Sequence, residues 1–380
     1  MIIIKHILKM EKALLDFKTK SLEELESYIN DEGFIWACKN GHLEVAKWLL
    51  SVKPDIKISD SEWYSSYEYC PLDSACKNGH LEVVKWLLHS GIYIINRWGT
   101  YESKYTSVFK IACQEGHLEL AKWLISAIPD IDISYYNEDA FRIACENGHF
   151  EVAKWLLLIK PDIDISAHNN YAFEKVCEND HIELVKWLLL IIPDINNSFA
   201  IVCRYGHLEI AQWFLSLKPD FDISIREEYA FRMACIGGYL EVAKWLFSVN
   251  PNINISNRNE YVFRIVCSKG YLEFAKWLLS VKPDIDISAE NESVFRNACK
   301  NEHLSMVQWL LSVKPEIDIS VYNEYVFWVA CENCNLDMAK WLLSVKPDID
   351  ISAHNNYAFE KVCENDHIEL AKWLEMLNKK

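Results

Sequence analysis

A tryptophan recurs along most of this chain at a nearly constant spacing, and that spacing limits the folds the sequence can adopt. Ten residues before each of these lattice tryptophans stands a cysteine. The tryptophans occupy positions 48, 86, 123, 155, 187, 213, 245, 277, 309, 341 and 373. The steps between them are 38, 37, 32, 32 and 26 residues, followed by 32 five times. Self-similarity with a period of roughly 20–50 residues predicts a solenoid or a related repeat array.

The repeat containing Cys145 illustrates the predicted unit. Phe141, Ala144 and Cys145 are spaced i, i+3 and i+4, which places them on one face of a first short helix. Gly148 follows as the residue that ends this helix in the left-handed conformation.

A second helix is predicted from Phe150 to Ile159, where apolar residues are so dense that we expect burial over much of its circumference. Pro161 prevents the helix from continuing. Asp162 to Ile165 then alternates polar and apolar residues, which predicts an extended link to the next unit.

Such helix pairs bury their apolar faces only by stacking on neighbours, so the expected fold is all-α, a linear array of about eleven helix-turn-helix units. Residues 31–380 form this array. Ser21-Leu22-Glu23-Glu24 matches a capping box, and we expect residues 1–30 to form a helical N-terminal cap.

The unit resembles the ankyrin repeat, which has a period of about 33 residues and a Thr-Pro-Leu-His-x-Ala signature. Cys70-Pro71-Leu72-Asp73-Ser74-Ala75 is the nearest local match to that signature. Gly79-His80-Leu81-Glu82-Val83-Val84 is similar to the start of the second ankyrin helix, and Asp162-Ile163-Asp164 to the family's extended segment. The resemblance implies an ankyrin-repeat solenoid whose units are linked by short β-hairpin-like fingers.

Phrases such as FRIACENGHFEVAKWLL, from Phe141 to Leu157, are similar to ankyrin proteins of giant viruses of amoebae. This resemblance implies a non-enzymatic scaffold or adaptor that binds other proteins. It also implies a viral protein that acts on host proteins inside the cell, in the host cytoplasm, and we expect it to be a monomer.

Composition and motifs exclude other classes of function. The net charge of −16 disfavours a nucleic-acid partner, which requires a basic surface. No apolar run approaches the ~20 residues that span a bilayer, so no membrane partner is expected. The sequence has neither a glycine-rich phosphate loop nor a recognisable catalytic set, so we expect no enzymatic activity and no cofactor.

Eight units place a histidine four residues after the lattice cysteine, as in Cys145 and His149. These pairs could form the edge of a metal site. However, zinc needs four ligands at about 2.0–2.3 Å, and neighbouring units are expected roughly 8–10 Å apart. The preferred interpretation is that the cysteine packs as a small apolar residue and the histidine serves the turn. A single CxxC, Cys331 to Cys334, leaves open a metal or redox role.

The first two links are longer than the others and rich in residues typical of binding hot spots. We expect them to contact a protein partner, although the same aromatic side chains could pack the links onto the array. A structural or spacer solenoid without a specific partner is the alternative. The candidate partner-binding residues are Trp63, Tyr64, Tyr67, Tyr69, Arg97, Trp98, Tyr101 and Tyr105.

Paired aspartates recur in the links and would form an acidic stripe on a stacked array. Such a stripe could attract a basic partner or calcium, but aspartate also caps turns through its own backbone, which is the interpretation we favour. The pairs are Asp130/Asp132, Asp162/Asp164, Asp220/Asp222, Asp284/Asp286 and Asp348/Asp350.

Overall fold

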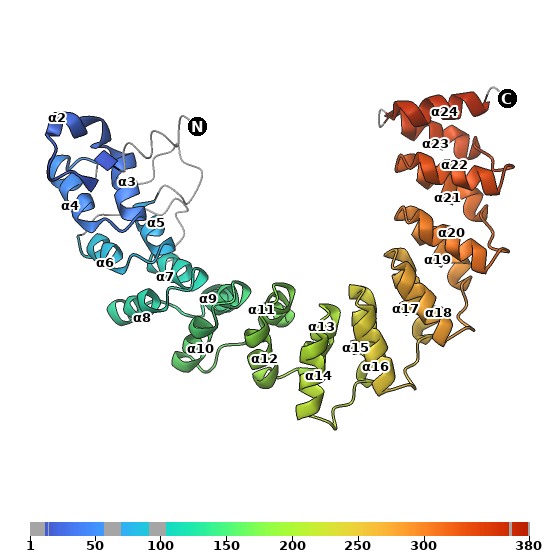
Figure 1. Ribbon diagram of the computed structural model, residues 1–380, viewed down its shortest axis with the longest axis horizontal. Coiled ribbons are helices and arrows are strands. Elements are labelled where there is room, and N and C mark those ends of the chain that lie inside the picture. The colour runs from blue at the N-terminus through green and yellow to red at the C-terminus, as the bar shows by residue number, and fades with distance from the viewer. Residues whose placement is uncertain (1–11, 14, 57–69, 91–103, 365–366, 379–380) are drawn as a thin grey trace. The chain divides into compact units, whose positions relative to one another are not determined.

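The computed structural model describes residues 12–13, 15–56, 70–90, 104–364 and 367–378 (Figure 1). Helices follow one another as pairs of a first and a second helix, as the repeat predicts, and a tight turn joins the two wherever that turn lies in the described residues. The lattice cysteine belongs to the first helix and the lattice tryptophan to the second. An all-α repeat solenoid is therefore confirmed.

The chain divides into two compact units, Met1–Asp194 and Ile195–Lys380. In the first unit the pairs are α3 (Asp31–Lys39) and α4 (Leu43–Val52), α5 (Pro71–Lys77) and α6 (Leu81–His89), α7 (Lys104–Gln114) and α8 (Leu118–Ala127), α9 (Tyr135–Glu146) and α10 (Phe150–Ile159), and α11 (Ala167–Glu178) and α12 (Ile182–Ile191).

In the second unit the pairs are α13 (Ile195–Arg204) and α14 (Leu208–Leu217), α15 (Ile225–Gly237) and α16 (Leu240–Val249), α17 (Asn257–Ser268) and α18 (Leu272–Val281), α19 (Ala289–Lys300) and α20 (Leu304–Val313), α21 (Val321–Glu332) and α22 (Leu336–Val345), and α23 (Ala353–Glu364) and α24 (Ile368–Asn378). Within each unit, the first helices of successive pairs pack side by side, as α9 packs on α11 and α15 on α17.

The short helices α2 (Leu22–Leu25) and η1 (Glu26–Tyr28) precede the first pair. The predicted capping box is present: the backbone N–H of Ser21 donates to Glu24 Oε2 at 2.9 Å, and the N–H of Glu24 donates to Ser21 Oγ at 3.3 Å. This reciprocal pair satisfies two backbone donors that the start of a helix would otherwise leave unpaired.

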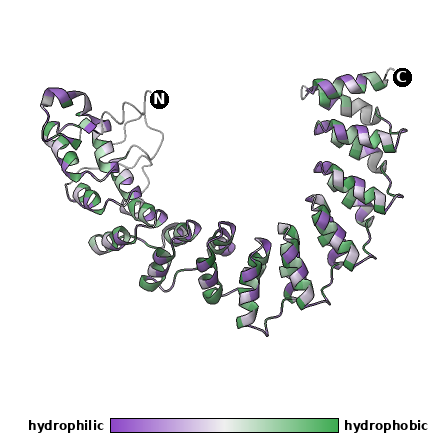
Figure 2. Ribbon diagram, in the orientation of Figure 1, coloured by the Kyte–Doolittle hydropathy of each residue, from purple (hydrophilic) through white to green (hydrophobic). Residues whose placement is uncertain are grey.

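The core follows the predicted apolar faces. Phe141, Ala144 and Cys145 of α9 are buried, as are Ala153 and Leu156 of α10. Hydrophobic and hydrophilic residues alternate along the helices, which Figure 2 shows as green and purple bands. Because each apolar face is covered by its own pair and by neighbouring pairs, the core within each unit follows the row of pairs rather than gathering in one central cluster.

The second helix is less buried than the sequence predicts. In α10, the side chain of Leu158 is 78% exposed and that of Ile159 is 39% exposed. In α12, the equivalent Leu190 is 52% exposed. Dense apolar sequence therefore overstates burial here, because the face of the helix that points away from the first helices has no neighbour to cover it.

Wherever the structure describes it, the turn inside a pair is closed as predicted. Gly148 has φ +75°, and its N–H donates to the carbonyl of Cys145 at 3.0 Å. In other pairs Asp180, Glu302 and Cys334 occupy this position with φ of 58°, 64° and 63°. The backbone of these residues is in the left-handed conformation, which glycine adopts without steric cost.

The links differ from the β-hairpin-like fingers implied by the resemblance. In the described residues most links consist of two consecutive turns, and none contains a strand. Each turn is closed locally, for example by the bond from the N–H of Ile163 to the carbonyl of Lys160 at 3.3 Å. Bonds within one link leave no ladder between links, which explains the missing strand. At the short 26-residue step, Ile195 already begins α13, and residues 192–194 alone connect it to α12.

Candidate partner-binding surface

The lattice histidine joins successive pairs. Nε2 of His149 lies 2.8 Å from the carbonyl oxygen of Gln114 in the preceding pair, and Nε2 of His181 lies 3.0 Å from that of Glu146. A carbonyl oxygen only accepts hydrogen bonds, so Nε2 is the donor in both rings. His80, His117 and His303 make the same contact with Lys39, Lys77 and Ser268. This contact assigns the imidazoles to the scaffold, in agreement with the role in the turn favoured above.

The lattice cysteines are also part of the scaffold. All are buried except Cys363 of the last pair. Burial raises the pKa of thiols such as Cys145 and Cys203 far above the ordinary value of 9.0, because the thiolate would lose its hydration. A thiol held neutral in this way packs as a small apolar side chain.

The CxxC motif spans the end of α21 and the turn that follows it. Burial, with a smaller contribution from Cys334, raises the pKa of Cys331 to about 12. Cys334 is half-buried, and its pKa is raised by burial and by the charge of Glu302. A reactive or metal-binding cysteine needs a lowered thiol pKa, which is the opposite of what both residues have. Within the described ranges, no group of three or more His, Cys, Asp or Glu residues is placed to hold a metal ion.

The second aspartate of each predicted pair closes a turn in its link. Oδ1 of Asp164 accepts the backbone N–H of Ser166 at 2.9 Å, and Asp222 makes the same bond to Ser224. The pKa of Asp222 is lowered from its ordinary value, chiefly by the bond from the Ser224 hydroxyl and then by the bond from its N–H. The equivalent bonds of Asp132, Asp286 and Asp350 repeat this geometry. These observations support the capping interpretation of the acidic stripe.

Most of the candidate partner-binding residues predicted from the long links lie outside the described residues. These are Trp63, Tyr64, Tyr67, Tyr69, Arg97, Trp98 and Tyr101. Tyr105 is described: it lies in the first turn of α7 and is half-buried. Their role in binding a partner stays a prediction.

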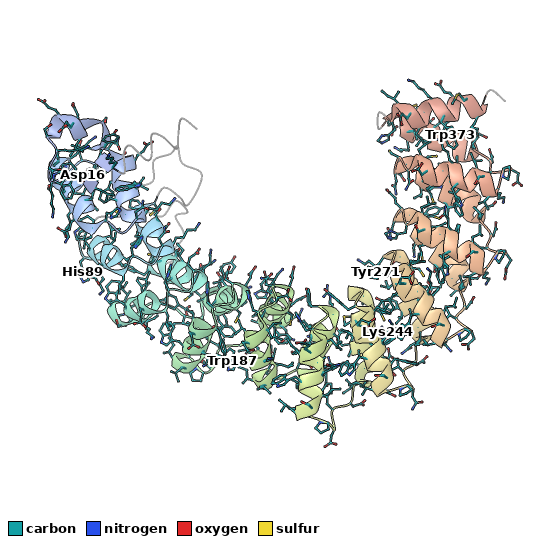
Figure 3. All side chains as sticks on the ribbon, viewed as in Figure 1. Asp16, His89, Trp187, Lys244, Tyr271 and Trp373 are labelled. Carbon is teal, nitrogen blue, oxygen red and sulfur yellow. The ribbon has the colours of Figure 1, made fainter. Side chains whose placement is uncertain are left out.

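The outward face of the second helices is similar in most pairs, although Gln212 of α14 and Gln308 of α20 stand where the other pairs have lysine. A glutamate and a lysine three residues later form an exposed ion pair, for example Glu44–Lys47 at 3.0 Å and Glu241–Lys244 at 2.8 Å. Lys244 of α16 is labelled in Figure 3. The same pair recurs as Glu82–Lys85, Glu119–Lys122, Glu151–Lys154, Glu183–Lys186 and Glu273–Lys276. Because this face repeats the same solvated ion pair, a binding partner could not distinguish one position along it from the next.

Four first helices of the second unit carry large aromatic or arginine side chains at equivalent positions. We call this set the Tyr–Arg surface. It comprises Tyr229 and Arg232 of α15, Tyr261 and Arg264 of α17, Arg296 of α19, and Tyr325 and Trp328 of α21. All are half-buried except Arg232, which is 8% exposed. Tyrosine, tryptophan and arginine are the residue types that dominate protein–protein hot spots.

Contacts within the Tyr–Arg surface hold its side chains in place. The guanidinium of Arg232 lies 5.5 Å from the ring centroid of Tyr229, and that of Arg296 lies 6.0 Å from that of Tyr325. The rings of Tyr325 and Trp328 meet edge to face at 5.0 Å. Cation–π and edge-to-face contacts restrict rotamers before any partner arrives, which lowers the entropy cost of binding.

Breaks in the repeat do not reveal this surface, because it lies within regular units. The signal is variation at a fixed register within the repeat. The position three residues before the lattice cysteine carries Arg142, Glu174, Ala200, Arg232, Arg264, Arg296, Trp328 and Glu360. Six of the eight arginines of the chain lie between residues 204 and 296, which also marks this region.

Comparison with known proteins identifies the repeat. The family description "Ankyrin repeats (3 copies)" matches residues 4–98, 173–259, 231–323, 262–355 and 296–378, and "Ankyrin repeats (many copies)" matches residues 109–157. No curated protein matches the chain. Among solved structures, the chain is similar to the human ASB11 ankyrin repeat domain, with 18% identity and a TM-score of 0.39 over 51% of this chain and 86% of that one. None of the described helices is long and apolar enough to cross a membrane.

Proposed function

Because this chain belongs to the ankyrin repeat family, we propose that it is a non-enzymatic scaffold that binds another protein through the exposed side of its first helices. Ankyrin repeats in general bind protein partners. The observation that supports this site is the Tyr–Arg surface, where hot-spot residue types are gathered on adjacent helices within one compact unit.

The first and second helices present different kinds of surface. On the second helices, glutamate and lysine are spaced identically in pair after pair. On the first helices, the position of Arg232 holds arginine again in the next two pairs, as Arg264 and Arg296, and tryptophan in the third, as Trp328. Only the second kind of surface can recognise one partner sequence in one register, because specificity is a difference of affinities between registers.

The aromatic segments of the two long links are a second proposed contact, at the eight residues named from the sequence. From the resemblance to proteins of giant viruses, we propose that the partner is a host protein and that binding takes place in the host cytoplasm. The chain would act as a monomer, presenting one copy of each surface.

A pull-down from amoebal lysate, with mass spectrometry, tests this function. The baits are the wild type, a variant with Tyr261→Ala and Trp328→Ala, and a variant whose two long links are cut to the 32-residue period. Lys244→Ala with Lys276→Ala, on the second helices, is the matched control. We expect a partner that the wild type and the control retain and that the Tyr261/Trp328 variant loses.

Retention by the Tyr261/Trp328 variant with loss by the trimmed variant would move the site to the long links. A purely structural spacer would retain no partner specifically in any of the four baits, and that result would contradict the proposal.

A further inference from the structure

A hollow of about 350 Å³ opens between the beginnings of α15 and α17 in the second unit. It is lined by Arg226, Glu227, Tyr229, Arg232 and Arg258. Three arginines and one glutamate give these walls an excess of two positive charges, in a protein whose net charge is −16. A concave site with convergent positive groups, inside a negative protein, favours an anionic ligand.

Arg232 forms the floor of this hollow and is fixed in position. It is 8% exposed, its Nη2 donates to the backbone carbonyl of Arg226 at 3.0 Å, and its guanidinium stacks on Tyr229. Glu228 lies close enough for its charge to interact with Arg232, but this carboxylate accepts its hydrogen bond from the backbone N–H of Asn254. The hydrogen bond of this nearly buried guanidinium therefore goes to a neutral carbonyl.

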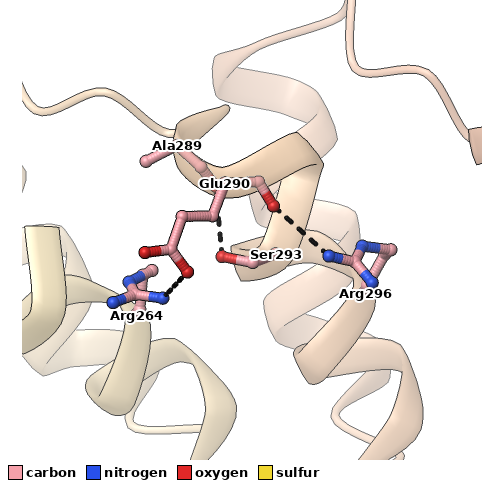
Figure 4. A network of polar contacts seen from close by, with 5 residues as sticks. All are labelled: Arg264, Ala289, Glu290, Ser293 and Arg296. Carbon is pink, nitrogen blue, oxygen red and sulfur yellow. Dashed lines mark hydrogen bonds and ion pairs between the residues drawn. The ribbon is translucent and has the colours of Figure 1, made fainter. Parts of the chain in front are cut away.

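In the next pair, the arginine at the same position binds a carboxylate from the protein itself (Figure 4). Arg264 is the equivalent of Arg232, and its Nη1 donates to the carboxylate of Glu290, at the beginning of α19. The backbone carbonyl of Glu290 also accepts from Nη2 of Arg296 at 3.3 Å. Between α17 and α19, the residue at the tip of the link is therefore an acid, and it pairs with the arginine of α17.

One step earlier, the tip residue that corresponds to Glu290 is Arg258. Their backbones are alike, with φ of 54° at Glu290 and 56° at Arg258. Arg258 cannot pair with Arg232 and instead binds Glu227, through Nε at 2.7 Å and Nη2 at 2.5 Å. The carboxylate that occupies the α17–α19 step is thus replaced by an open, positively charged hollow at the α15–α17 step.

We propose that this hollow is the binding site for a carboxylate of the partner protein, which takes the place that the Glu290 carboxylate has in the next pair. The inference rests on the proposed function and names the chemistry of one contact in it. Arginine matches a carboxylate with two parallel N–H donors, and such charge-assisted bonds are the strong ones. The carboxylate of Glu227 at the rim opposes a second negative charge, which favours a carboxylate over a phosphate dianion.

The test uses random short peptides displayed without a free C-terminus and selected on the full chain. Arg258→Glu is the variant compared with the wild type. It places an acid at the tip of the link, as Glu290 does in the next pair, so that the protein's own carboxylate occupies the site. Lys244→Glu, on the exposed side of α16, makes the same change of charge outside the hollow and is the control. Circular dichroism on thermal unfolding checks that both variants fold.

We expect the wild type and Lys244→Glu to select peptides with a required Asp or Glu. We also expect Arg258→Glu to bind these peptides about tenfold or more weakly. Changing the peptide acid to its amide should give a loss of the same size. Synthetic copies with free and amidated C-termini distinguish a side-chain carboxylate from a terminal one.

Peptides that lack an acid, or that bind Arg258→Glu equally well, would overturn the carboxylate site while leaving a protein-binding scaffold intact. A phosphoserine peptide that binds at least tenfold more tightly than its glutamate counterpart would reassign the hollow to a phosphorylated partner. Failure of every bait to select any peptide would count against both the carboxylate site and the proposed scaffold function.

Discussion

The ring of His149 lies directly against the α-carbon of Gly116 in the preceding pair. A Cβ on Gly116 would come within 2.4 Å of Nδ1 of His149. At the same time, Nε2 of this ring donates to the carbonyl of Gln114 at 2.8 Å. One imidazole therefore contacts the preceding pair in two ways. It packs where Gly116 has no side chain, and it donates a hydrogen bond to a carbonyl at the end of the helix, where helical partners run out. Gly41, Gly79, Gly148 and Gly270 meet the histidine of their following pair in the same way.

Gly116→Ala is expected to destabilise the array by about 2–3 kcal/mol. The left-handed φ of +76° alone costs about 1–2 kcal/mol for a residue with a Cβ, and the methyl must also displace the imidazole. The measurement is urea unfolding followed by tryptophan fluorescence. Native-state hydrogen exchange of α8 and α10 would show that the loss is local.

The chain itself suggests the control for this prediction. Where the glycine is replaced by Glu302, the following pair carries Asn335 in place of the ring. Gly116→Ala combined with His149→Asn should therefore lose less than the sum of the two single changes. Strict additivity would mean that the ring and the glycine do not interact energetically.

The repeat itself explains why so much of the fold could be predicted. A lattice cysteine and a lattice tryptophan at constant separation repeat one local arrangement, so the two helices and the glycine turn could be predicted from the segment Phe141 to Pro161. The contact between His149 and Gln114 did not follow. It joins residues 35 apart, and periodicity says nothing about which carbonyl a side chain reaches in the next unit.

The candidate site was harder to predict, for a related reason. The hollow at Arg232 exists because Arg258 stands where the next link has Glu290. Arg258 and Glu290 are unremarkable in sequence, since charged residues are frequent next to links. Their effect depends on which residue of the neighbouring helix pair they face. That residue can be identified only once the alignment between successive pairs is known.

Cys334→Gly is expected to stabilise the array by about 1 kcal/mol. Cys334 has φ +63° in the turn after α21, a conformation that glycine adopts without the steric cost of a Cβ. Its thiol makes only a weak contact, 3.7 Å from the carbonyl oxygen of Glu332. Thermal unfolding should show a higher midpoint, and Glu302→Gly, with φ +64°, should behave alike. A lower midpoint for both variants would show that these side chains contribute more than their backbone costs.

Thiol labelling should separate the lattice cysteines from Cys363. The exposed Cys363 is expected to react with iodoacetamide in the native protein, whereas buried thiols such as Cys145 and Cys267 should react only after unfolding. Burial raises the pKa of both buried thiols, and the thiolate is the reactive species. Peptide mapping by mass spectrometry gives the labelled positions. Native labelling of Cys145 at a rate similar to that of Cys363 would contradict the buried lattice.

Glu228→Gln should increase stability at neutral pH and have no effect in acid. Burial is the main cause that raises the pKa of Glu228 above its ordinary 4.5, and Asp222 adds to it, while the Asn254 N–H and Arg232 act in the opposite direction. The folded protein therefore holds this proton more tightly than the unfolded chain does. It follows that stability falls as the pH rises from the unfolded pKa through the folded one. An amide keeps an acceptor for Asn254 and removes the titration.

Melting temperatures of the wild type and Glu228→Gln, measured from pH 3.5 to pH 8 in ~0.5 pH steps, should coincide at the acid end and separate above the folded pKa. The size of the gain is modest, because solvent screens a carboxylate that is only partly buried. Glu241→Gln, on the solvated face of α16, is the matched control and should run parallel to the wild type throughout. A gain that is constant from acid to neutral pH would show that packing, and not the charge of Glu228, accounts for it.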